Sequence, residues 1–286
     1  MCNRLKTLLL LRIAGVVYSL SSTIAAMDIK DPAEDYAFVE AEPYLTFKTG
    51  QDNVTQKGVF PRLYSQMDFP AGQSAGHTLF GEIRAGWTDR DVLDKGVKLN
   101  NGPLQRYGLG FGGMLFEKEH HDAFVMGLAG LNIDRHEIGG NDWSSEWLAG
   151  YVFKPNKRLN FGGGLDLMRY QGGWFPYPLL LLDWRLYDTG KLRCNGDVLE
   201  FKQFFAPIFC LVTGLRYNFE YYTLKGGTEI QDDSIGAELG FEYMFLENAY
   251  ARFRYKYVIW GEEQIKGQST NSIQGNSLRL NIAYGI

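Results

Sequence analysis

Long uninterrupted runs of apolar residues are missing from this 286-residue chain once its first 26 residues are set aside. Residues 178–182 are typical of its longest runs, far below the roughly 18 to 20 apolar residues that a spanning helix needs. The sequence therefore argues against a helical membrane protein. Basic charge is also scarce. Because 29 Lys and Arg stand against 33 Asp and Glu, we expect no nucleic-acid partner.

Cysteine and histidine are rare, with three and four residues. Cys2 lies in the leading segment, so Cys194 and Cys210 are the pair that could form one disulfide. Two free thiols are the alternative, because spacing alone fixes no geometry. His120 and His121 are better explained as part of a solvated turn than as metal ligands. No zinc spacing or nucleotide-binding loop is present, so we expect neither a metal nor a cofactor.

The first 26 residues have the pattern of a secretory signal peptide, with a basic start, an apolar stretch and a small-residue exit. Cleavage after Ala25 and cleavage after Ala26 both stay open, and a short uncleaved anchor is the alternative. We predict residues 1–26 as the signal peptide and 27–286 as one domain, since no linker divides them. Removing the signal leaves 26 basic residues and a net charge of about −7.

Glycine and aromatic residues are abundant, with 34 Gly, 19 Phe and 17 Tyr. Many short strands separated by glycine turns would produce this composition. Apolar and polar residues alternate in segment after segment, most clearly at about 211–221, 235–245, 249–259 and 277–286. The apolar face is rich in Phe and Tyr, and the opposite face carries charge. An outer-membrane barrel has this inside-out pairing of faces.

On these features the chain resembles bacterial outer-membrane β-barrel proteins of the porin-like kind. The resemblance covers the export signal, the amphipathic strands and a closing strand that the barrel-assembly machinery would recognise by its apolar residues Leu278, Leu280, Ile282, Tyr284 and Ile286. Such proteins usually end in an aromatic residue, whereas this chain ends in isoleucine. The resemblance implies a place in the outer membrane of a Gram-negative-type bacterium, in contact with its lipid, more strongly than it implies an activity.

The predicted fold is all-β, a transmembrane antiparallel barrel of about 12 strands, with 10 or 14 strands also open. Residues 192–207 could hold one strand or two, and residues 58–65 could add another. The residues from 224 to 233 and from 261 to 275 are predicted as long outer loops. Residues 246–248 are predicted as a tight periplasmic turn.

Charged residues at alternate positions of the last three strands form the best candidate site. If the aromatic faces meet lipid, the inward side chains are Glu238, Glu242, Arg252, Arg254, Lys256 and Arg279, with Asn281 beside them. In one interpretation this basic wall lines a water-filled pore and favours anionic solutes. In the other, the carboxylates pair with the arginines and fill a narrow lumen.

We predict a passive pore or binding barrel for small polar solutes, anionic solutes included. A non-conducting structural or surface-interaction barrel is the alternative, with residues 49–76 or 261–275 as its contact surface. No catalytic residues are predicted and we do not expect an enzyme. The outer-membrane phospholipase arrangement of a His with a Ser two residues later is absent, which leaves a lipid hydrolase as a distant alternative. A soluble exported β-sandwich would bury its apolar faces in a core.

Overall fold

The structure is a computed structural model that describes residues 38–50, 58–74, 77–89, 91–94, 97–100, 102–134, 142–170, 173–224, 227–246, 249–265, 268–272 and 274–285. The predicted signal peptide lies outside these residues, so its cleavage stays a prediction. In the described part of the chain, no helix is long and apolar enough to cross a membrane.

The described residues form strands joined by turns. The strands that build the main sheet are β1 (Phe38–Gly50), β2 (Gly58–Ser74), β3 (His77–Thr88), β6 (Leu104–Glu117), β7 (His121–Ile133), β8 (Trp143–Asn156), β9 (Leu159–Tyr170), β10 (Gly173–Tyr187), β11 (Gly190–Asn195), β12 (Val198–Ala206), β13 (Phe209–Leu224), β14 (Thr228–Leu246), β15 (Ala249–Ile265), β16 (Gln268–Ser272) and β17 (Gln274–Gly285). The short strands β4 (Leu93–Asp94) and β5 (Val97–Lys98) pair only with each other.

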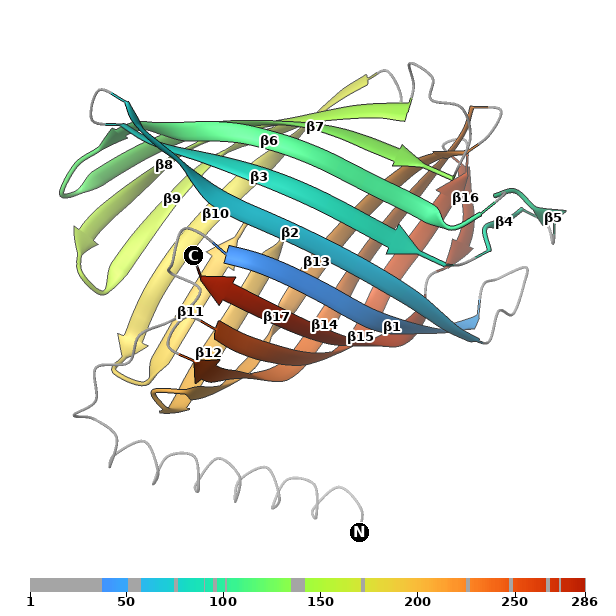
Figure 1. Cartoon of the computed structure of the whole chain (residues 1–286). Coiled ribbons are helices and arrows are strands. Elements are labelled where there is room, and N and C mark those ends of the chain that lie inside the picture. The colour runs from blue at the N-terminus through green and yellow to red at the C-terminus, as the bar shows by residue number, and fades with distance from the viewer. Residues whose placement is uncertain are drawn as a thin grey trace, which may run out of the picture.

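Sequential antiparallel pairing closes the sheet into a barrel (Figure 1). The ring runs from β1 through β3, then from β6 through β15, and returns through β17 to β1; the pairing of β14 with β15 leaves no break in it. Strand β16 pairs only with the far end of β15 and lies just before β17 in the chain. Among the described residues, the ring therefore has fourteen strands.

The predicted antiparallel barrel is confirmed, at the upper end of the predicted range of strand numbers. Two strands, β11 and β12, occupy the stretch where the alternation was weakest, and β2 supplies the uncertain strand near the start. Three segments that were predicted as loops are mostly strand. Residues 49–76 are mostly strand β2, and only three residues separate β13 from β14, where a long loop was expected. Residues 261–275 are mostly the ends of β15 and β17 with β16 between them.

The outer surface of the ring is apolar and the inner surface is polar. Along most of the strands whose side chains the structure describes, exposed large apolar side chains alternate with buried or half-buried ones. The outward set includes Leu109, Phe111, Trp147, Leu165, Leu180, Leu239, Phe241, Tyr257 and Ile282. A closed barrel with an apolar outer belt and a charged interior is the architecture of an outer-membrane protein, and it rules out the soluble sandwich.

Glycines let β8 and β9 approach closely. A Cβ atom on Gly162 would overlap the carbonyl oxygen of Tyr151 on the neighbouring strand, whereas a Cβ on Gly163 would meet its nearest atom, the Leu179 carbonyl oxygen, at 3.2 Å. We therefore expect Gly162→Ala to lower the free energy of unfolding by about 1–3 kcal/mol, the usual cost of overpacking. Urea unfolding of the refolded barrel measures this cost. Gly163→Ala is the matched control, and an equal loss in both variants would contradict the explanation.

Candidate functional site

The predicted inward-facing charges lie together on one wall of the barrel interior. Cross-strand pairing places Glu242 of β14 beside Arg252 of β15 and Glu238 beside Lys256. The next strand, β17, adds Arg279 beside Arg254, and Asn281 beside Arg252. These side chains are buried or half-buried because the barrel interior covers them.

Arg254 is the centre of this charged wall and is only 2% exposed. Its guanidinium donates from Nη1 to Glu238 Oε2 at 2.8 Å and from Nη2 to Glu200 Oε2 at 2.7 Å. Glu242 Oε1 lies 3.5 Å from the same Nη2. One buried cation thus holds carboxylates from two different strands, β12 and β14.

The three carboxylates bind further cations. Lys202 Nζ lies 3.0 Å from Glu242 Oε2, and Arg252 Nε also donates to Glu242. Glu238 Oε1 accepts from Arg216 Nε at 3.0 Å and lies 3.7 Å from Arg279 Nη1. We call this set the ion network: Glu200, Lys202, Arg216, Glu238, Glu242, Arg252, Arg254 and Arg279.

Three members of the ion network were missed in the sequence. Glu200 and Lys202 lie on β12, in the stretch that could not be divided into strands, and Arg216 lies on β13. Alternation does mark them. Val198, Glu200, Lys202 and Phe204 share one face, and exposed Leu199 lies on the other. Lys256 was predicted here, but its Nζ contacts Ser234 Oγ at 3.4 Å rather than a carboxylate.

A second charged group lies on strands β3, β8 and β9. Arg84 pairs with Glu82 on its own strand, and its Nη1 lies 3.3 Å from Glu146 Oε2 on β8. Asp166 of β9 is buried, and its Oδ1 has no hydrogen-bond partner among the described residues. The interior therefore carries both signs of charge on more than one part of the wall.

A cavity of about 500 Å³ lies inside the barrel and touches both charged groups. Its guanidinium groups come from Arg84, Arg106, Arg193, Arg216, Arg252 and Arg279. Its carboxylates come from Glu146, Asp166, Asp197, Glu200 and Glu220. A polar cavity of this size holds many water molecules, because one water needs only about 30 Å³.

Two of the cavity arginines form no ion pair with any described residue. Arg193 lies beside Asp183 and Glu200 in the sheet, but Lys191 Nζ pairs with Asp183 at 2.8 Å, and Glu200 belongs to the ion network. Arg106 lies beside Gly86 and Asn132, which carry no charge. Arg193 still interacts electrostatically with Glu200, but neither guanidinium forms a salt bridge with a described residue, so both can contact an anion in the cavity.

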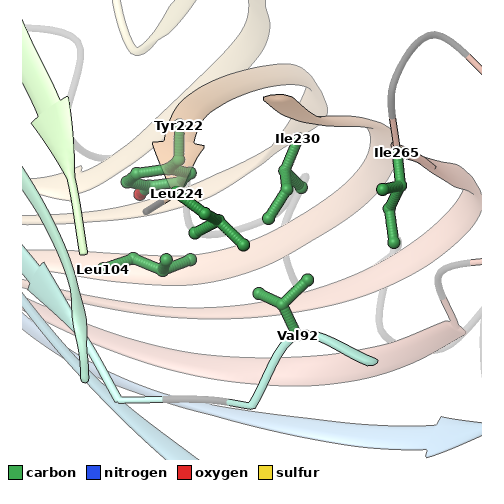
Figure 2. Close-up of a cluster of buried hydrophobic side chains, with 6 residues drawn as sticks. All are labelled: Val92, Leu104, Tyr222, Leu224, Ile230 and Ile265. Atoms are coloured by element: carbon green, nitrogen blue, oxygen red, sulfur yellow. The ribbon is translucent and has the colours of Figure 1, made fainter. Parts of the chain in front are cut away.

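The segment between β3 and β6 packs against strand ends at one mouth of the barrel, and we call its described residues, 89, 91–94, 97–100 and 102–103, the mouth loop. Val92 of this loop is fully buried in an apolar cluster with Leu104, Tyr222, Leu224, Ile230 and Ile265 (Figure 2). These partners lie at the ends of β6, β13, β14 and β15, so Val92 anchors the mouth loop to strand ends at this mouth. Asn100 fixes it, because its Oδ1 accepts from Val92 N at 2.8 Å.

The two remaining cysteines are free thiols, and both are buried. Cys194 of β11 pairs with Leu199, and Leu199 pairs with Leu215, five positions along β13 from Cys210. Five residues span roughly 16 Å along a strand, well beyond the reach of a disulfide. Cys210 donates instead to Glu242 Oε2 at 3.7 Å.

The remaining predicted residues lie on the closing strand β17 and at the turn between β6 and β7. Leu280 and Ile282 of the closing strand face outward, while Ile286 and the side chain of Tyr284 lie outside the described residues. His120 and His121 lie at the turn between β6 and β7; His120 Nδ1 lies 3.1 Å from the Lys154 carbonyl oxygen. In the described part of the chain, no three His, Cys, Asp or Glu side chains are grouped to hold a metal ion.

Comparisons with known proteins give a similar architecture without a family. No family model matches the sequence, and no curated protein matches it. The solved NanC porin is 8% identical over 87% of this chain and 100% of its own, with a TM-score of 0.44. An outer-membrane channel from Pseudomonas putida F1 is 11% identical over 89% and 99%, with a TM-score of 0.44. At these values the comparisons indicate no solute, which has to be inferred from the interior of this barrel.

Proposed function

We propose that the protein is an outer-membrane channel for small polar solutes, with a preference for anions. The observation that supports this proposal is the cavity, which is lined by Arg106 and Arg193 as cations outside any salt bridge with a described residue. Each of the other cavity arginines pairs with a carboxylate of the interior: Arg84, Arg216, Arg252 and Arg279. Two guanidiniums outside such salt bridges would attract a carboxylate or phosphate to the interior.

The outer belt would meet membrane lipid, and the closing strand would serve assembly of the barrel. We further propose passage rather than catalysis, because the cavity charges are arranged as ion pairs and as single arginines. Such groups can attract and orient a solute. They offer no nucleophile with an adjacent base.

Anion preference is tested by planar-bilayer recording of the refolded protein across a salt gradient. We expect conductance steps whose reversal potential indicates anion preference, and we expect Arg106→Gln with Arg193→Gln to reduce the anion-to-cation permeability ratio at least twofold. Lys157→Gln is the control, because this exposed turn residue lies outside the cavity. An unchanged ratio in the double variant would contradict the role of the two arginines, and a folded but silent wild-type barrel would contradict the channel.

The second candidate function is a non-conducting structural barrel. Burial of the ion network and the packing of Val92 against strand ends at one mouth both favour it. The two functions differ in what happens when the mouth loop is released. A channel should then conduct more, whereas a barrel with a filled lumen should stay silent and lose only stability.

A further inference from the structure

The hairpin formed by β11 and β12 is too short to complete the barrel wall. Strand β11 has six residues, whereas a strand that crosses a bilayer needs about 9–11. Its last residue, Asn195, pairs with Leu181 of β10, and the first residue of β12, Val198, pairs with Arg216 of β13. Beyond these pairs, β10 continues back to Gly173, and on this side β13 runs on without a neighbouring strand in the described chain until Thr223, which pairs with Ile133 of β7.

The open part of the wall lies at membrane depth. On β10, the outward side chains beyond the hairpin tip remain apolar, with Leu180 62% and Trp174 54% exposed. Pro176 and Pro178 between them are also exposed. Because apolar outward side chains mark the lipid-facing band of a barrel, the hairpin ends inside this band.

Pro176 and Pro178 are compatible with a strand edge that has no neighbouring strand. The Leu180 carbonyl oxygen accepts from Gly196 N at 3.0 Å, so the backbone of Leu180 faces the hairpin. Alternate residues of a strand direct their backbone groups to the same side, which places Pro176 and Pro178 on that same side. Proline lacks a backbone N–H, so at two positions β10 has no donor that would require a neighbouring strand.

Aromatic side chains close the gap between β10 and β13. Tyr170 is the centre: its ring lies 4.2 Å from Phe175, 4.9 Å from Phe219 and 5.2 Å from Tyr221. Tyr177 lies 6.2 Å from Phe219, and its hydroxyl is 3.1 Å from that of Tyr170. We call these five residues the aromatic gate. Side-chain contacts can separate at far lower cost than a ladder of backbone hydrogen bonds.

The interior cavity reaches this gate. Its lining includes Leu179, Asn195, Val198 and Phe219, which flank the hairpin tip and the gap above it. A smaller cavity of about 40 Å³ is lined by Tyr170, Phe219 and Tyr221 of the gate and also by Arg106. Arg193, whose guanidinium lacks an ion pair in the described chain, lies two residues below the hairpin tip.

We propose that the gap above the hairpin is a side entrance, through which a small amphipathic molecule with an aromatic or apolar body and a carboxylate head passes between the membrane and the cavity. The aromatic gate receives the apolar body, and Arg193 or Arg106 receives the head. This entrance goes beyond the proposed channel, because it needs no movement of the mouth loop.

A reversible lock tests the entrance. In a variant whose native cysteines are serine, Tyr177→Cys and Phe219→Cys are joined by a short bifunctional thiol reagent that a reductant cleaves. The readout is uptake of phenylacetate into proteoliposomes, compared with acetate, which has the same head and no ring. We expect the lock to lower phenylacetate uptake at least fivefold, to leave acetate uptake unchanged, and to be reversed by reduction. Unchanged phenylacetate uptake, or an equal fall for both solutes, would overturn the proposal.

Removing two aromatic side chains of the gate should change phenylacetate uptake in the opposite direction. Tyr177→Ala with Phe219→Ala should raise phenylacetate uptake at least threefold. The matched control is Phe241→Ala with Phe253→Ala, an aromatic pair 5.4 Å apart on the lipid-facing side of two fully paired strands. An equal rise in the control would mean that loss of any aromatic pair loosens the wall, and it would overturn a specific gate.

A measurement without transport separates failure of the entrance from failure of the channel. A spin label is attached at Phe219→Cys in a variant that also carries Tyr177→Ala. The measured quantity is the relaxation of the label by oxygen, which concentrates in lipid, and by a water-soluble nickel chelate. At a side entrance oxygen should relax this label as strongly as one at Phe253→Cys, on the lipid face. A label at position 219 that oxygen does not reach would overturn the entrance, even in a barrel that conducts. A reached label in a barrel that passes no solute would leave the entrance standing and contradict the channel.

Discussion

Replacing Arg254 with alanine should lower the free energy of unfolding by about 3–5 kcal/mol, because removing one partner strands buried opposite charges. Arg254 lies within 3.5 Å of Glu200, Glu238 and Glu242, and all three carboxylates are buried. Lys202 would remain beside Glu200 and Glu242, and Arg216 beside Glu238, but neither cation contacts all three carboxylates as Arg254 does. The measurement is the urea dependence of unfolding for the refolded barrel, followed by tryptophan fluorescence and heat-modifiable electrophoresis.

The control for this variant is an exposed ion pair of the same kind. Arg158 Nη2 lies 2.8 Å from Asp188 Oδ1, and both side chains are more than half exposed. Arg158→Ala should cost about 0–1 kcal/mol, since water screens the pair. A loss of similar size in both variants would mean that the ion network contributes no more than a surface pair. It would then favour an interior that is open to water around Arg254.

The fold was predictable wherever both faces of a strand are clear. In β14, β15 and β17 a period of two separates exposed Leu239, Tyr257 and Leu280 from the charged residues between them, so strand, register and direction of the side chains follow together. The pattern failed in β11, because six residues give only three side chains per face. It also failed in β2, where Pro61 and Pro70 made the segment resemble a loop.

The candidate site was predictable only in its local part. Glu238, Glu242, Arg252 and Arg254 lie on two adjacent strands joined by a tight turn, so alternation alone brings them together. The contact of Arg254 with Glu200 joins residues 54 positions apart and depends on how many strands lie between them. The pairing of Thr223 on β13 with Ile133 on β7 is still harder to predict from the sequence, because five strands separate them in the ring.

Replacing Val92 with aspartate should release the mouth loop and raise the open probability of the channel at least tenfold. Val92 is fully buried among Leu104, Tyr222, Leu224 and Ile230, where a carboxylate would have no partner to compensate its lost hydration. Burial of a valine side chain contributes roughly 1.5–3 kcal/mol to the free energy that holds the mouth loop in place. Because about 1.4 kcal/mol is a tenfold change in an equilibrium constant, losing this burial should shift the loop equilibrium toward release at least tenfold. The barrel should still form, because the loop lies outside the paired strands of the ring.

Val97→Asp is the matched control on the same loop, since Val97 is 64% exposed and lies outside the apolar cluster. It adds the same charge to the same mouth without displacing a buried side chain. Planar-bilayer recording should therefore show frequent or lasting openings for Val92→Asp and wild-type behaviour for Val97→Asp. Equal openings in both would assign the effect to surface charge. Silence in a correctly folded Val92→Asp barrel would instead place the block deeper, at the ion network, and would favour the non-conducting barrel over the channel.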